Sequence, residues 1–191
     1  NKTLKCENNH CYDISKRGYI NLLLNPDKAT NNPGDSKESL VARKAYLNKG
    51  YYDPILNQVI HCIDEFKHQD TLSILDLGCG EGYYTQGLKK HFESSDVYGL
   101  DISKIAIDMA TRYRKDITWL VGNSKNIPIL DHSLDFICAL FTVVNQDELK
   151  RALKKDGYII HVTANNQHLI EIKELIYDEI KVKSDKYIRL D

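Results

Sequence analysis

The sequence predicts an α/β fold, in which a parallel β-sheet is covered by helices on both faces. From about residue 53 onward, short apolar segments alternate with segments of helical periodicity, a pattern typical of parallel sheets with helical crossovers. One apolar segment, "LSILDLG", runs through a glycine-rich turn directly into a helix-forming segment. A chain of 191 residues, 42% hydrophobic and 28% charged, suits one ordinary domain with at most a small appendage.

The first expected helix covers about residues 36 to 49. Asp35 and Glu38 have the spacing of a capping box, and Gly50 can supply a left-handed cap at the other end. The preceding segment "NPDKATNNPGD" is rich in Pro, Asn and Gly, so a domain boundary is expected there. It separates residues 1–34 from residues 35–191.

The remaining elements follow in chain order. Pro54 is well placed in the first turn of a second helix over about 54 to 67. Hydrophobic periodicity then predicts strands at 72–78, 96–102, 117–123, 134–141 and 157–163, with helices at 82–92, 103–114 and 146–155.

Composition excludes several classes of protein. No apolar run approaches the roughly 18 residues needed to cross a bilayer, and no secretory leader is evident. Five scattered cysteines do not resemble a disulfide framework. A cytoplasmic protein with no membrane partner is therefore expected.

Charge is divided unevenly along the chain. Residues 1–50 carry nine Lys/Arg against five Asp/Glu, whereas residues 51–191 carry seventeen against twenty-two. A basic N-terminal segment on an acidic body suits a polyanionic partner. Ordinary solvated charge explains the same composition equally well.

The segment "ILDLGCGEGYYT" carries the clearest chemical signal. A hydrophobic strand leads into Asp76 and three glycines at alternate positions, which let the backbone turn tightly and approach a ligand closely. Asp101 stands at the end of the next strand, where a carboxylate can accept both ribose hydroxyls. Glu81, inside the loop, would repel a pyrophosphate but suits a ligand bearing a sulfonium and an ammonium, so S-adenosylmethionine (SAM) is favoured over NAD.

Residues 53 to 165 resemble the class I SAM-dependent methyltransferases, which have a Rossmann-like sheet. The resemblance implies that Asp101 holds the ribose, and that Asn123 and Ser124 hold the adenine edge. Many members have Asp where Asn123 stands, although an amide oxygen can still accept a hydrogen bond. The methionine end is expected at Asp76, Gly78, Cys79, Gly80, Glu81 and Gly82.

The segments "HCYDISKRGYINLL", "GDSKESLVARKAYLNKGYY", "GCGEGYYT" and "LDISKIAI" together resemble a narrower family. This is the bacterial 23S rRNA (guanine-N1)-methyltransferase family, RlmA, whose relatives confer macrolide resistance, and the resemblance runs from Cys6 to Tyr177. It implies methyl transfer to N1 of a guanine in a hairpin loop of 23S rRNA, a step of rRNA processing. A small-molecule methyltransferase and a non-catalytic SAM-binding or RNA-binding module remain alternatives.

The same resemblance implies an N-terminal zinc knuckle that recognises RNA. The family pattern is a C-x2-C pair followed by C-x3-H, and Cys6 and His10 match the second pair. The first pair is expected before Asn1, so the zinc site is incomplete in this chain, and residues 1–34 are interpreted as a remnant of the module with its linker. Cys11 is not expected to be a ligand, and two ligands rarely hold structural zinc.

Further residues are assigned by the resemblance or by charge. Tyr52 and His168 match family residues beside SAM, although a packed surface aromatic and a solvated loop histidine would explain them too. The residue that removes the N1 proton is not identified by sequence. Basic side chains expected to hold the rRNA backbone, or else to decorate a solvated surface, are Lys16, Arg17, Lys37, Arg43 and Lys44.

The chain also departs from the class I pattern. A sixth strand and an antiparallel seventh have no convincing counterpart after Tyr177, so the last strands are expected to be missing. The segment "KKDGY" stands where many methyltransferases have K-P-G-G, and Gly157 retains the turn. A large rRNA substrate also leaves room for a homodimer.

Overall fold

The computed structural model describes residues 2–23, 34–112 and 114–177. Among them, eight strands form one sheet in the order β1-β2-β3-β6-β5-β4-β7-β8. Five of these strands correspond to those expected from the sequence: β4 (Ser73–Leu77), β5 (Asp96–Asp101), β6 (Thr118–Val121), β7 (Leu134–Leu140) and β8 (Leu153–Val162). They are parallel throughout, as predicted.

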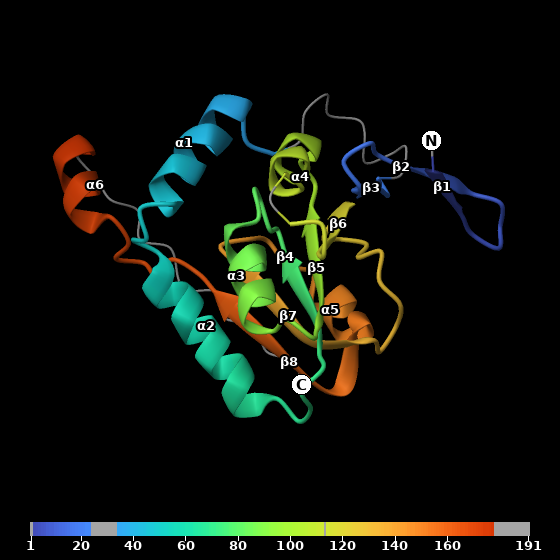
Figure 1. Cartoon of the computed structure of the whole chain (residues 1–191). Coiled ribbons are helices and arrows are strands. Elements are labelled where there is room, and N and C mark those ends of the chain that lie inside the picture. Colours follow the sequence, from blue (N-terminus) through green and yellow to red (C-terminus); the bar gives the residue numbers. More distant parts are fainter. Residues whose placement is uncertain (1, 24–33, 113, 178–191) are drawn as a thin grey trace.

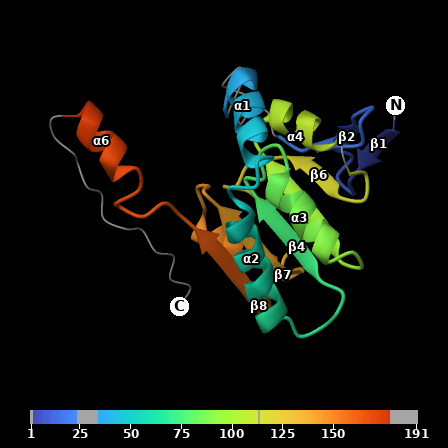
Figure 2. The ribbon, with the colours of Figure 1, turned by 60° about the vertical axis from the view of Figure 1, so that its left-hand side comes forward.

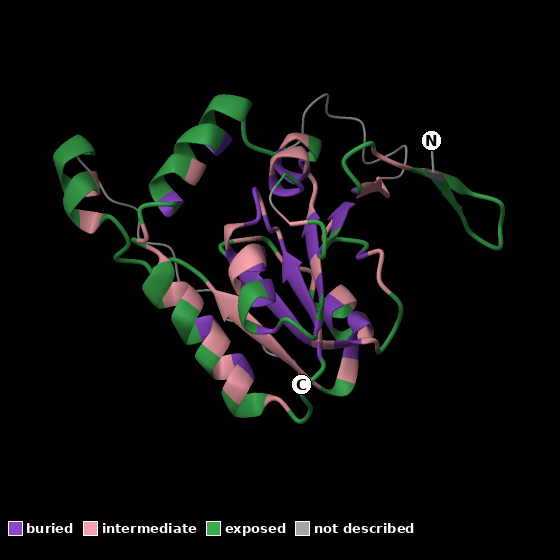
Figure 3. Cartoon of the chain, viewed as in Figure 1, coloured by how far each residue is buried: buried purple, intermediate pink, exposed green. Residues whose placement is uncertain are grey.

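One face of the sheet is covered by α2 (Asp53–Phe66), α3 (Tyr83–His91) and α4 (Lys104–Ala110) (Figure 1). The apolar sides of α2 and α3 pack on β4 and β7, with Ile63, Leu88 and Ile74 fully buried. The helix α4 packs on the β6 end of this face, against Trp119 and Val121. These contacts bury the central strands on this side, as Figure 3 shows in purple.

The opposite face is covered by α5 (Gln146–Ala152) and by the segment between β6 and β7. Leu149 and Ala152 of α5 pack with Ile127 against Leu75 and Ile137 of the sheet. Arg151 fastens this segment, because its guanidinium donates to the carbonyl oxygens of Ile127 and Ile129 as well as to two carboxylates. Helices on both faces confirm the predicted architecture.

The N-terminal segment contains strands that the sequence analysis did not predict. β1 (Lys2–Lys5) and β2 (Cys11–Ile14) form an antiparallel hairpin, and β2 pairs with the short strand β3 (Ile20–Asn21). β3 then pairs in parallel with β6, through Ile20 opposite Leu120 and Asn21 opposite Val121. The segment expected to be the zinc module is therefore part of the same sheet as the parallel strands. The domain boundary at residue 34 stays a prediction.

Two local predictions were wrong. The helix α1 (Lys37–Leu47) is capped by Ser36 rather than Asp35, because the Ser36 hydroxyl accepts from the Ser39 amide. The helix expected over 146–155 ends at Ala152, and Leu153 starts β8. Ladder pairing with β7 and burial of Leu153 outweigh the helical pattern of "RALKK".

The helix α6 (Ile170–Ile176) lies away from the body of the sheet, which Figures 1 and 2 show from two directions, whereas α1 lies beside α4 near the carboxyl ends of the strands and buries Leu40 and Leu47. Gly50, after α1, has the left-handed backbone expected of it, with φ of 80°. The expected absence of further strands after Tyr177 concerns residues 178–191, which lie outside the described residues. None of the helices in the described part of the chain has the length and apolar character of a bilayer span.

Candidate functional site

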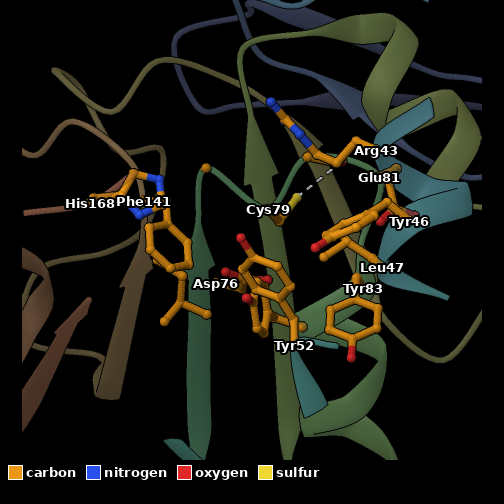
Figure 4. A pocket seen from close by; sticks show the side chains of 14 residues that line it. Arg43, Tyr46, Leu47, Tyr52, Asp76, Cys79, Glu81, Tyr83, Phe141 and His168 are labelled. Atoms are coloured by element: carbon orange, nitrogen blue, oxygen red, sulfur yellow. Dashed lines mark hydrogen bonds between the residues drawn. The ribbon is translucent and has the colours of Figure 1, made fainter. Parts of the chain in front are cut away.

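A cavity of about 440 Å³ opens at the carboxyl ends of β4 and β7 (Figure 4). β4 is the first strand of the parallel set, and the chain adds β5 and β6 on one side of it and β7 on the other. Ligands of open α/β sheets bind at such a switch point. The lining residues are Arg43, Tyr46, Leu47, Tyr52, Asp76, Gly78, Cys79, Gly80, Glu81, Tyr83, Tyr84, Leu140, Phe141 and His168.

The glycine-rich loop forms the floor of this cavity. Gly78 has φ of 74°, and a Cβ there would lie 2.6 Å from Thr142 Cβ. Gly82, the N-cap of α3, has φ of 88°, and its Cβ would lie 2.5 Å from the Trp119 ring. Both positions therefore require glycine for backbone conformation and for space. Cys79 between them is buried, and burial raises the pKa of its thiol well above the usual range.

Asp76 is fully buried at the end of β4, and it lines the cavity. Its carboxylate accepts a hydrogen bond of 2.5 Å from the Thr85 hydroxyl on α3. Burial raises the pKa of Asp76 to about 7, against the lowering effect of that hydrogen bond. A cationic ligand in the cavity would offset the cost of ionising this group.

Glu81 lies in the same loop and is 4% exposed. Its Oε2 lies 3.4 Å from the ammonium nitrogen of Lys44, which reaches across from α1. Burial raises the pKa of Glu81, and the Lys44 charge opposes that rise. The Lys44 ammonium group therefore occupies the position beside Glu81 that the sequence predicts for the ammonium group of a ligand.

Asp101 binds the loop rather than lining the cavity. One oxygen accepts from the Gly80 amide at 2.8 Å and the other from the Ser103 amide at 2.7 Å. Burial raises the pKa of this carboxyl group. A carboxylate has about four acceptor positions, so capacity for ligand hydroxyls remains after these two bonds.

Asn123 and Ser124 follow β6 and are half-buried, outside the set of residues that line the cavity. The Asn123 side-chain oxygen accepts from the Lys125 amide at 3.0 Å. The role assigned to this pair stays a prediction, as does that of Asp101. Gly82 is likewise adjacent to the cavity rather than on its wall.

Tyr52 and His168 both line the cavity, from the start of α2 and from the segment before α6 (Figure 4). Seven of the predicted cofactor residues therefore converge there, together with Arg43, which was assigned to RNA. The residues that the sequence analysis missed are Tyr46, Leu47, Tyr83, Tyr84, Leu140 and Phe141. Among these, Tyr83 and Tyr84 directly follow the glycine loop, a position that could have indicated them.

Cys6 and His10 lie together at the tip of the β1–β2 hairpin. The Cys6 sulfur is 3.4 Å from His10 Nδ1, and both residues are exposed. A thiolate and an imidazole at this distance suit two corners of a tetrahedral zinc site. No group of three potential ligands occurs in the described parts of the chain, and the Cys11 thiol instead donates to the Asn9 carbonyl.

Three of the basic residues assigned to RNA have carboxylate partners. Arg17 pairs with Asp108 at 2.7 Å, Arg43 pairs with Asp35 at 2.6 Å, and Lys44 pairs with Glu81. Arg17, Lys16 and the cations Arg112 and Lys115 line a second hollow between the β2–β3 turn and the end of α4. The assignment of Lys16, Arg17, Lys37, Arg43 and Lys44 to RNA stays a prediction.

Two family models match the chain. The model described as "Methyltransferase domain" matches residues 74–157, which contain the glycine loop and the cavity floor. The model described as "RlmA, N-terminal", a zinc ribbon, matches residues 1–29. The order of the two matches is the order predicted from the sequence.

Relatives and solved structures agree with these matches. The chain is 31% identical over 93% of its length to the "Putative 23S rRNA (guanine-N(1)-)-methyltransferase YxjB" of Bacillus subtilis, and spans 64% of that protein. It is 28% identical over 99% of its length to the "23S rRNA (guanine(748)-N(1))-methyltransferase" of Streptomyces fradiae, and spans 67% of it. A SAM-dependent methyltransferase from Aquifex aeolicus shares the fold with a TM-score of 0.51 and 26% identity, over 58% of this chain and 64% of that one.

Proposed function

We propose that the intact protein methylates 23S rRNA, because this chain belongs to the RlmA-type 23S rRNA (guanine-N1)-methyltransferases. The reaction is transfer of the methyl group of SAM to N1 of a guanine in a hairpin loop, with S-adenosylhomocysteine as the leaving group and release of the N1 proton. The observation that carries the proposal is the convergence of the glycine loop, Asp76, Tyr52 and His168 on one cavity at the sheet's switch point. The chain spans less than two thirds of the Bacillus subtilis relative, so the activity is assigned to the whole protein.

The cavity suits a cationic amino-acid ligand with a sulfonium. Its floor combines the backbone of the glycine loop with two buried carboxyl groups, Asp76 and Glu81. Both carboxyl groups have raised pKa values because of burial, so a positively charged ligand would favour their ionised forms. In this proposal the ligand's ammonium competes with Lys44 for Glu81, and Asp101 holds the ribose.

The chemistry assigned to the protein is mainly alignment. Methyl transfer from a sulfonium is an in-line displacement, and holding both reactants in that line supplies much of the rate enhancement. SAM, when bound, supplies the methyl group. The guanine must present its Watson–Crick edge, which an unpaired loop base can do.

The N-terminal segment is proposed to recognise the RNA. Cys6 and His10 are proposed to give two ligands of a zinc ion, and the distance of 3.4 Å between the thiol sulfur and the imidazole nitrogen supports this. Lys16, Arg17, Lys37 and Arg43 are proposed phosphate contacts. For Arg17 and Arg43, phosphate would have to replace or share the carboxylate partners they have here.

The cellular role, the location and the oligomeric state are proposed from the substrate. We propose a role in rRNA processing in the cytoplasm, where the ribosomes are, with macrolide resistance as the alternative role. A homodimer on one large RNA site belongs to the same proposal. Drug sensitivity of cells with and without the gene separates the maturation and resistance roles.

A direct assay tests the proposal. The intact protein is incubated with methyl-tritiated SAM and a hairpin fragment of 23S rRNA, and the digested RNA is analysed by mass spectrometry. N1-methylguanosine is expected with the wild type. Asp101→Ala is expected to lose SAM binding in calorimetry, with circular dichroism showing that the variant is folded. A wild type that binds SAM yet forms no methylguanosine would contradict the proposal.

A further inference from the structure

We propose that four aromatic side chains at and beside the mouth of the cavity, Tyr46, Tyr51, Tyr52 and Phe141, form the surface on which the target guanine stacks, with Tyr52 shared between this surface and the SAM pocket. These four residues are called the aromatic rim. The inference rests on the proposed function and assigns the part of the site that receives the RNA base. Figure 4 shows Tyr46 of α1, Tyr52 at the start of α2 and Phe141 at the end of β7 around the opening.

The rings of the rim form a continuous chain of contacts. Tyr51 and Tyr46 have ring centroids 5.1 Å apart, Tyr46 meets Tyr52 edge to face at 6.1 Å, and Tyr52 meets Phe141 edge to face at 6.1 Å. The last contact links the segment between α1 and α2 with the end of β7. Two separate parts of the chain are therefore held against each other at the cavity mouth through aromatic rings.

Three of the rings are exposed despite these contacts. Tyr51 is 61% exposed, Tyr46 49% and Phe141 47%. Aromatic side chains that are exposed to this extent cost free energy in water, and contiguous apolar patches mark binding sites. The rim lies beside the polar floor of the cavity, since Tyr46, Tyr52 and Phe141 line the same cavity as Asp76 and Glu81.

Phe141 carries the most specific evidence. It follows β7 directly and has φ of 56°, a left-handed conformation that is unfavourable for a bulky side chain. The strained residue is fixed in place, because its amide donates to the Val162 carbonyl at 2.8 Å. Strained residues held by their surroundings cluster at ligand contacts, and here the strain aims a ring at the cavity mouth.

The chemistry of the rim fits a nucleobase. Unpaired RNA bases bind by stacking on aromatic side chains, and each such contact is worth about five- to 150-fold in affinity. The rim adjoins Arg43, which also lines the cavity and has a half-exposed side chain that can face a phosphate. An exposed aromatic surface with an adjacent arginine suits a nucleotide better than a purely apolar substrate.

The test compares Tyr46→Leu and Phe141→Leu with Phe66→Leu in the intact protein. Phe66 is 44% exposed and contacts Tyr158, but it lies at the far end of α2 from Tyr52. The RNA is the 23S hairpin, with 2-aminopurine replacing the target guanine for fluorescence and unmodified RNA for kinetics. Calorimetry measures SAM affinity of each variant separately.

Both rim variants are expected to weaken RNA binding about tenfold, to lose the stacking quench of 2-aminopurine and to change SAM affinity much less than RNA affinity. Phe66→Leu is expected to match the wild type, and Phe141→Tyr to restore the quench. If the wild type methylates the RNA but the rim variants bind RNA as Phe66→Leu does, the rim is not the base surface. A loss of SAM affinity alone would likewise overturn the inference, whereas a wild type that methylates no RNA would contradict the proposed function itself.

Discussion

Tyr84 has a hydroxyl group that the fold buries without a hydrogen-bond partner in the described parts of the chain. The residue is 9% exposed and packs among Val59, Leu88 and other apolar side chains of the core. A buried polar group with no partner costs about 1 to 3 kcal/mol, because it has lost its hydrogen bonds to water. Tyr84→Phe removes that group and keeps the ring.

The expected result is a gain of stability. Tyr84→Phe should raise the free energy of unfolding by about 1 kcal/mol, which corresponds to about 2 to 4 °C in the melting temperature of a protein of this size. The adjacent Tyr83 provides a matched control, since its hydroxyl donates to the Asp53 carboxylate. Tyr83→Phe should therefore lower the free energy of unfolding by about 1 kcal/mol.

Urea unfolding and calorimetric melting of the ligand-free protein measure both variants. Opposite signs for two neighbouring tyrosines would support the assignment of one unpaired and one paired hydroxyl. If Tyr84→Phe is instead destabilised as much as Tyr83→Phe, the Tyr84 hydroxyl has a partner in solution and the reasoning fails.

Four other changes test the fold and the site. Burial raises the pKa of Asp76 to about 7, so the stabilising protonated form is fully present below pH 4 and is lost as the pH rises to 7. Over that range the stability of the wild type should fall relative to that of Asp76→Asn by up to about 4 kcal/mol. Parallel urea-unfolding profiles of the two proteins would contradict this. Gly82→Ala combines a left-handed backbone with a 2.5 Å approach to Trp119 and should cost about 2 kcal/mol or more in urea unfolding; unchanged stability would show that the loop relaxes freely. Arg151→Ala removes hydrogen bonds to two carboxylates and two carbonyl groups and should lower the free energy of unfolding by about 2 kcal/mol. An unchanged free energy of unfolding would show that the segment before β7 does not depend on Arg151. Cys6→Ser should abolish the binding of about one zinc ion by the intact protein at unchanged SAM affinity, and retained zinc in elemental analysis would remove Cys6 from the ligand set.

The central part of the fold could be predicted because its signals are local. The apolar run before Gly78 fixes a buried strand, and the glycines fix a tight turn into α3, so the cavity floor follows from one continuous segment. Tyr52 and His168 came from the family resemblance rather than from a local pattern, and both line the cavity.

The remainder depends on contacts between distant residues. The pairing of Ile20 with Leu120 joins the N-terminal hairpin to the sheet across about a hundred residues, and no local pattern specifies it. Leu153 begins a strand because β7 lies beside it, although its neighbours favour a helix. No local pattern indicates Phe141 as a site residue, because its left-handed backbone and its contact with Tyr52 exist only in the folded chain.

The most direct test of the central claim is primer extension on 23S rRNA from cells with and without the full-length gene. N1-methylguanine blocks Watson–Crick pairing, so reverse transcriptase should stop beside one hairpin-loop guanine in RNA from cells that carry the gene. The stop should be missing from cells without it. The same stop in both RNAs, or none in either, would contradict the proposal that the intact protein is a 23S rRNA (guanine-N1)-methyltransferase.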